Sequence, residues 1–60
     1  AAPDLIAALN SAQATERANA ATVLGYIADP QARPALQLAT IDQDPDVRAA
    51  VAWALDQLPG

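Results

Sequence analysis

The chain has 60 residues, a net charge of −4 and three basic side chains, all of them arginine. Nucleic acids and anionic membrane surfaces bind basic patches, so we expect neither as a partner, and no apolar run approaches the roughly 20 residues that span a bilayer. Cysteine and histidine are absent, which removes thiolate metal sites and the commonest general base. We therefore expect no metal, no cofactor and no catalytic residue.

The apolar residues are mostly small. Alanine contributes 17 residues, whereas leucine, isoleucine and valine together contribute 13, and the aromatic residues are Tyr26 and Trp53. Alanine is the best helix former and lets helices approach closely, but it adds little buried area. We predict one all-α domain over residues 1–60, with a thin core of the kind that usually needs a neighbour.

Two helices are expected in the first half of the chain, over roughly residues 3–10 and 13–27, because apolar residues recur there at helical spacing. Gly25 is expected to weaken the last turn of the second helix. The residues that we expect to face the core are Leu5, Ile6 and Leu9 in the first helix, and Ala20, Val23, Leu24 and Ile27 in the second.

Two further helices are expected in the second half, over roughly residues 31–41 and 45–58. Asp-Pro pairs at 29–30 and 44–45 precede them, and each pair places a cap acceptor before the residue best suited to the first helical position. The apolar residues of the first of these helices are Leu36, Leu38 and Ile41, and the second carries Val47, Val51, Ala54, Leu55 and Leu58 on one face.

An internal repeat relates the two halves. A shift of 31 residues, without a gap, aligns proline with proline, leucine with leucine and arginine with arginine. The aligned pairs include Pro3 and Pro34, Leu5 and Leu36, Arg17 and Arg48, and Leu24 and Leu55. We predict two helix–turn–helix repeats, about 1–29 and 30–60, stacked as an α-solenoid fragment or a miniature four-helix array.

The stretch "DPQARPALQLATIDQDPDVRAAVAWALDQL" contains an Asp-Pro turn, a Pro-Ala-Leu helix start, an Asp-Pro-Asp-x-Val-Arg turn and an Ala-Ala-x-Ala-Leu run. This order resembles the HEAT repeat, specifically the short bacterial type named after phycobilisome lyases. The first repeat departs from the pattern, because it lacks the second Asp-Pro turn and has Glu16 where the second repeat has Val47. Thr40 stands where the family usually has leucine.

The resemblance implies a non-catalytic protein–protein interaction module or accessory subunit that uses the concave face of its second helices. The expected partner is another protein, bound through an apolar helix or loop, and self-association or flanking repeats would cover the ends of the stack. Two alternatives stay open: a subunit or fragment of a bilin lyase-like enzyme acting on phycobiliproteins, and a purely structural subunit of a larger complex.

The aspartates of "DQDPDVRAAVAWAL" could suggest a calcium loop. A calcium-binding helix–loop–helix that started at Asp42 would need glycine at its sixth position and glutamate at its twelfth. Those positions hold Val47 and Trp53. The pattern is more typical of a helix start, in which Asp44 caps the helix and Asp46 complements the positive end of its dipole.

The two aligned arginines also have an expected role. By resemblance, Arg17 and Arg48 form a structural ladder with aspartates of the inter-helix turns, and ligand binding by either arginine is the alternative. Arginine suits the structural role because its planar fork can bridge a carboxylate and backbone carbonyls. The expected ladder aspartates are some of Asp29, Asp42, Asp44 and Asp46.

One polar stripe of the second helices carries both aromatic residues. Positions 19, 22 and 26 align with 50, 53 and 57, and their spacing places each set on one side of a helix. Tyrosine and tryptophan are enriched at binding hot spots, whereas the alternative is that Trp53 fills the space between helices left by small alanines. The predicted partner-binding residues are Asn19, Thr22, Tyr26, Trp53 and Gln57.

Overall fold

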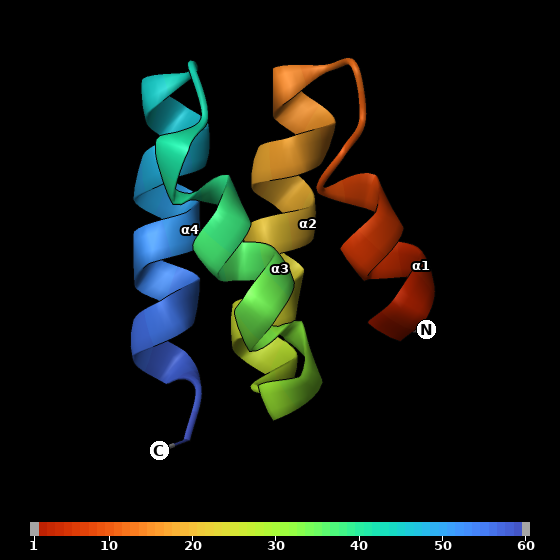
Figure 1. Cartoon of the computed structure of the whole chain (residues 1–60), viewed down its shortest axis with the longest axis vertical. Helices are drawn as coiled ribbons and strands as arrows, with labels where there is room; N and C mark the ends of the chain where they lie inside the picture. The colour runs from red at the N-terminus through yellow and green to blue at the C-terminus, as the bar shows by residue number, and fades with distance from the viewer. Residues whose placement is uncertain (1, 60) are drawn as a thin grey trace.

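The computed structural model describes residues 2–59, which form α-helices joined by short turns (Figure 1). The helices are α1 (Ala2–Ala8), α2 (Ala14–Ile27), α3 (Arg33–Leu38) and α4 (Pro45–Gln57), with 3₁₀ turns η1 (Pro30–Ala32) and η2 (Ala39–Ile41) on either side of α3. No strand occurs within residues 2–59, and the all-α prediction is confirmed.

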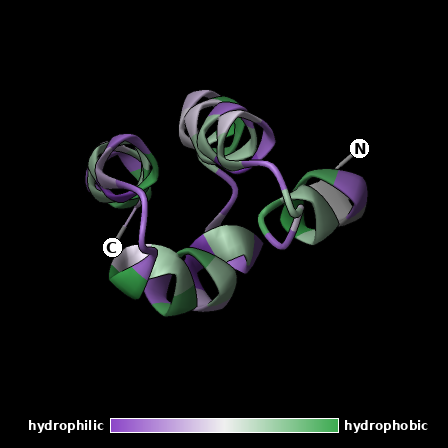
Figure 2. Cartoon of the chain, turned by 90° about the horizontal axis from the view of Figure 1, so that it is seen from above, coloured by the Kyte–Doolittle hydropathy of each residue, from purple (hydrophilic) through white to green (hydrophobic). Residues whose placement is uncertain are grey.

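The helices form two layers, which Figure 2 shows from above. In one layer α2 and α4 lie side by side and run in the same direction, while α1 and α3 run the opposite way in the other layer (Figure 1). α2 packs chiefly against α4, α1 packs against α2, and α3 packs against α4. Each half of the chain is therefore one antiparallel helix pair, and the two pairs are stacked.

Both Asp-Pro signals begin helical segments, as predicted. The side chain of Asp44 accepts hydrogen bonds from the backbone N–H groups of Asp46, at 2.8 Å, and Val47, at 3.3 Å. Asp29 accepts one from the backbone N–H of Gln31 at 2.9 Å. The proline that follows each aspartate loses nothing by lacking an N–H, because the first helical position has no acceptor for one.

The segment around α3 differs from the continuous helix predicted over 31–41. Leu36 is fully buried, but Leu38 is 80% exposed and Ile41 is 87% exposed. Leu38 follows Leu36 by two residues, and so lies about 200° further around the helix. The 3₁₀ turn η2 has about three residues per turn, which brings Ile41 back to the side of Leu38. Of the three apolar residues of the predicted helix, Leu38 and Ile41 therefore lie outside the core.

The core is thin and contains many alanines. Its largest fully buried side chains are Leu24, Leu36, Val47 and Val51. The predicted face of α4 is buried except at Leu55, which is half-buried. The buried apolar residues are Leu9, Ala20, Ala21, Leu24, Ala32, Leu36, Val47, Val51, Ala54 and Leu58.

The buried side of α2 is the predicted one only in part, because Ala20 and Leu24 are buried but the other two predicted residues are not. Val23 and Ile27 are 40% and 48% exposed, whereas Ala21 and Gly25 are buried beside Leu24. The prediction that Val23 and Ile27 are core residues is wrong because it followed hydrophobicity alone. Small residues on one side of a helix permit closer helix packing, and α2 presents its small side to α4.

Gly25 sets the distance between α2 and α4. A Cβ atom at this position would lie 2.5 Å from Cζ3 of Trp53 and 2.9 Å from Cα of Ala54. Both separations are far shorter than van der Waals contact, so a larger residue fits only if its neighbours move. Gly25 is therefore a packing residue and not merely the weak point that the sequence suggested.

Candidate functional site

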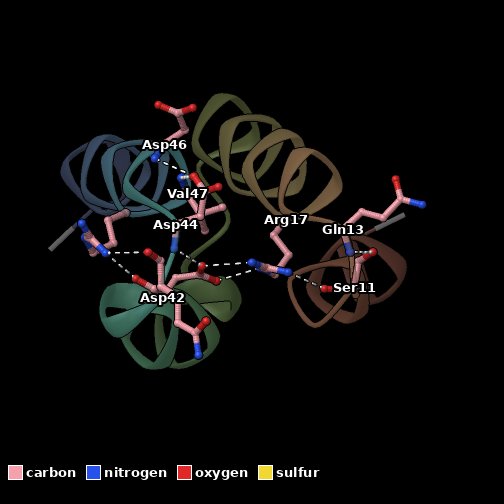
Figure 3. A network of polar contacts seen from close by, with 9 residues as sticks. Ser11, Gln13, Arg17, Asp42, Asp44, Asp46 and Val47 are labelled. Carbon is pink, nitrogen blue, oxygen red and sulfur yellow. Dashed lines mark hydrogen bonds and ion pairs between the residues drawn. The ribbon is translucent and has the colours of Figure 1, made fainter.

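Arg17 connects the two repeats at the turns that precede α2 and α4 (Figure 3). Its Nε donates to Oδ2 of Asp42 at 2.8 Å, and its Nη2 donates to Oδ1 at 3.1 Å. Its Nη1 donates to the backbone oxygen of Ser11 at 2.9 Å. The side chains of Arg17 and Asp42 are only 18% and 12% exposed. One guanidinium thus ties the α1–α2 turn to the α3–α4 turn.

Asp42 is held in its ionised form. The hydrogen bond from Arg17 lowers the pKa of its carboxyl group, and a second bond, from the backbone N–H of Asp44 at 2.9 Å, acts in the same direction. The same contact with Asp42 raises the pKa of Arg17. A carboxylate with a lowered pKa is a poor proton donor or acceptor near neutral pH. The geometry of this pair is that of a structural link.

Arg48 occupies the equivalent position one repeat later. Its Nη1 donates to the backbone oxygens of Asp42, at 2.7 Å, and Gln43, at 3.1 Å. The bond to Asp42 is the counterpart, 31 residues on, of the bond from Arg17 to Ser11. Within residues 2–59, no carboxylate forms an ion pair with Arg48, and its side chain is exposed.

Of the four aspartates named for the ladder, Asp42 pairs with an arginine, and the other three do not. Asp29 and Asp44 accept hydrogen bonds from backbone N–H groups at helix starts, and Asp46 is exposed. The carboxylate that pairs with Arg17 belongs to Asp42, as the prediction allowed. The repeat register relates the two acceptors of Arg17, because Asp42 is the counterpart of Ser11 in the second repeat, and Arg17 also binds the Ser11 carbonyl.

Residues 2–59 contain no group of three or more acidic, histidine or cysteine side chains arranged to hold a metal ion. None of the helices described is long and apolar enough to cross a membrane.

The two aromatic residues of the predicted binding stripe come together across the repeat boundary. Tyr26 of α2 and Trp53 of α4 have ring centroids 5.1 Å apart and ring planes inclined at 62°, a favourable edge-to-face arrangement. Tyr26 is 77% exposed and Trp53 is 38% exposed. A pair of rings from two different helices therefore reaches the surface.

The polar members of the stripe lie along the same two helices. Asn19 and Gln57 are exposed. Thr22 is half-buried, and its hydroxyl donates to the backbone oxygen of Ala18 at 3.0 Å. Asn19 also lines a hollow of about 250 Å³, together with Asp46 and other residues at the starts of α2 and α4. The stripe thus continues from the aromatic pair towards the helix starts.

Trp53 combines features of both roles considered for it. One side of its ring covers Gly25, where only a glycine leaves room for it. The rest of the side chain remains accessible and touches Tyr26. Trp53 is consequently both a spacer between α2 and α4 and a part of the exposed surface.

Sequence reasoning missed a groove of about 310 Å³. It was missed because its walls include the exposed side chains of Leu38 and Ile41, whose exposure was not predicted. The groove is lined by Leu9, Asn10, Arg17, Ala35, Leu38, Ala39, Ile41 and Asp42.

Comparison with known proteins agrees with the geometry of the stacked helix pairs. Searches of the curated proteins and of the solved structures found no match. A family model for HEAT repeats matches residues 2–60, almost the full length of the chain. The HEAT-repeat family generally serves protein–protein interaction or scaffolding and is generally non-enzymatic. The chain belongs to the HEAT-repeat family.

Proposed function

We propose that this chain is a non-catalytic protein–protein interaction module. Its binding site is the aromatic surface, which we define as Asn19, Thr22, Tyr26, Trp53 and Gln57. The observation that carries the proposal is the exposed Tyr26–Trp53 pair, which is built from both repeats. The general role of HEAT repeats in protein–protein interaction supports it.

The exposure of Tyr26 is the strongest part of the argument. With 77% of its surface accessible, the side chain contributes little buried area to the fold. Its edge contact with Trp53 nevertheless restrains the ring, so less conformational entropy is lost when a partner covers it. Rigid aromatic anchors of this kind dominate the energetics of many interfaces.

The chemistry of the surface points to an apolar helix or loop as the bound element. The two rings supply an apolar centre, and the exposed amides of Asn19 and Gln57 supply a polar rim. Asp46, near Asn19 in the adjoining hollow, favours a partner with a basic residue beside its apolar anchor.

Tyr26→Ala tests this surface with little effect on the fold. The chain is immobilised and incubated with native extract, and the retained proteins are compared with those retained by Leu38→Ala, a control at an equally exposed apolar residue. We expect specific partners to be retained by the parent and the control, and to lose about 2 kcal/mol of binding free energy in Tyr26→Ala. Identical sets from all three proteins would disprove the proposed surface.

Trp53→Ala should affect both binding and folding. Since Trp53 is 38% exposed, we expect a folding loss somewhat below the roughly 3–5 kcal/mol of a fully buried aromatic, or about 2 kcal/mol. Chemical denaturation followed by circular dichroism measures the folding loss, and binding is then compared under conditions in which both proteins are folded. A variant that is equally stable and binds equally well would contradict both roles of Trp53.

A further inference from the structure

The groove between α1 and α2 has a counterpart inside the molecule. It has a volume of about 260 Å³ and is lined by Leu5, Ala8, Glu16, Asn19, Ala20 and Val23. The residues 31 positions further on are Leu36, Ala39, Val47, Ala50, Val51 and Ala54. In that second set, the leucine, the two valines and the last alanine are fully buried, and α2 packs against α4, which carries most of the set. The groove is therefore the first repeat's version of the surface on which the two repeats meet.

The element that would fill the groove is also present in the chain. In the internal contact, α2 turns towards α4 the buried side that contains Ala21, Leu24 and Gly25. The counterparts of these residues on α4 are Ala52, Leu55 and Asp56. Ala52 and Asp56 are exposed and Leu55 is half-buried, so this side of α4 is accessible.

The charges at the two surfaces are complementary. Arg17 uses Nε and Nη2 to bind Asp42 of the following repeat, whereas Arg48 has only its Nη1 engaged, on backbone oxygens. The counterpart of Asp42 is Ser11, which has no carboxylate of its own. The Ser11 hydroxyl, however, donates to Oε1 of Glu16 at 2.7 Å. The carboxylate of Glu16 therefore lies beside Ser11, the position equivalent to the aspartate that Arg17 binds.

We propose that copies of this chain associate head to tail. The outer side of α4 in one copy docks in the α1–α2 groove of the next, and Arg48 of the first copy pairs with Glu16 of the second. Asn19 and Thr22 belong to both surfaces, but Tyr26 and Trp53 lie outside the contact between copies, so the inference does not rest on the proposed function. Repetition of the contact extends the two-helix layer of α2 and α4 from copy to copy.

The contact between copies is looser than the one between repeats. Asp56 stands where the internal contact has Gly25, and its Cβ requires a wider helix spacing. Thr22 stands where the internal contact has Trp53, so the new contact lacks the apolar area that the indole ring contributes. The association is consequently reversible and depends on protein concentration.

Sedimentation equilibrium of the chain at about 10 μM to 1 mM, in physiological salt, tests the association. We expect the average mass to rise with concentration and to pass that of a dimer, because a head-to-tail contact does not close on itself. Glu16→Arg and Arg48→Glu should each weaken the association about tenfold by placing like charges together. An equimolar mixture of the two variants should associate again, because every contact in alternating copies joins opposite charges.

Val23→Glu provides a test that leaves Arg48 and the turns untouched. Val23 is 40% exposed, so the monomer accepts the change, but the charge lies in the groove and should weaken the association about tenfold. Leu38→Glu, at an exposed apolar residue outside the groove, should associate like the parent. Circular dichroism shows that each variant is folded.

Several results would overturn the inference. A parent chain that is monomeric at 1 mM would assign the groove to a different partner or to a flanking repeat. Growth that stops at a dimer would indicate a symmetric contact. Association that survives Val23→Glu, or a mixture of the charge variants that fails to recover, would place the contact elsewhere. None of these results would bear on binding through Tyr26, which the Tyr26→Ala experiment tests separately.

Discussion

Gly25→Ala tests whether one missing side chain sets the spacing of α2 and α4. The added Cβ would lie 2.5 Å from Cζ3 of Trp53 and 2.9 Å from Cα of Ala54. The Trp53 ring is partly exposed and can turn aside, but Cα of Ala54 belongs to the backbone of α4. The substitution therefore forces either a rotation of the ring together with a shift of the helix, or strain in both.

The expected effect is the difference between two opposing terms. Alanine favours a helix interior over glycine by about 1 kcal/mol. Overpacking of a close contact usually costs about 1–3 kcal/mol, and the backbone contact places this site near the middle of that range. We expect a net destabilisation of about 1 kcal/mol, which in a chain of this size lowers the melting temperature by about 4–8 °C.

Chemical and thermal unfolding measure the change, and the fluorescence of Trp53, the chain's one tryptophan, reports movement of its ring. Asn19→Ala, at an exposed position of α2, is the control for helix propensity and should stabilise by about 0.5 kcal/mol. The penalty of Gly25→Ala should shrink when Trp53→Ala is also present, because one of the two close contacts is then gone. Stabilisation by the full 1 kcal/mol or so, with unchanged fluorescence, would refute the spacing argument.

Two further predictions concern the polar turns. Thermal unfolding should show the largest loss of stability for Arg17→Ala, which removes a bidentate contact with a carboxylate. Arg48→Ala should lose about 1 kcal/mol of stability, and Arg33→Ala, which loses only a bond to the Pro59 carbonyl, less than about 0.5 kcal/mol. Equal losses in all three variants would show that the arginines of the turns add no special stability. The pKa of the Asp42 carboxyl group is lowered in the folded state, so this group is protonated at a higher pH in the unfolded chain than in the folded one. The stability of the fold should therefore decline as the pH falls below about 4. Urea unfolding across a pH series should show a less steep decline for Asp42→Asn.

The parts of the fold that depend on near neighbours could be predicted from the sequence. Asp29 and Asp44 cap the segments that follow them through bonds to residues two or three positions away, and both starts were recognised. The split of the third segment was not recognised. The split depends on how the chain joins α3 both to α2 and to α4, and the turn η2 places Ile41 on the exposed side with Leu38.

In the candidate site, too, the features set by near neighbours could be predicted, and those set by distant contacts could not. The stripe that carries Tyr26 and Trp53 follows from helical spacing, but the contact between the rings depends on the close approach that Gly25 permits. No local pattern relates a glycine on one helix to a tryptophan on another. The pairing of Arg17 with Asp42 likewise crosses from one repeat to the next, and the register of the repeat is the feature of the sequence that points to it.

The misplaced residues of α2 have a common explanation in that register. A helix inside a stack has two sides that meet neighbours, and both can be apolar, so hydrophobicity alone does not tell which side is covered. Val23 and Ile27 are the counterparts of Ala54 and Leu58, which are both buried, and Ala54 lies against Gly25 of the preceding repeat. They are exposed because, within the described chain, no helix occupies the corresponding place beside α2. The exposure of Val23 and Ile27 is thus typical of a repeat surface that no neighbour covers. For the same reason, association of the chain should respond to Val23→Glu.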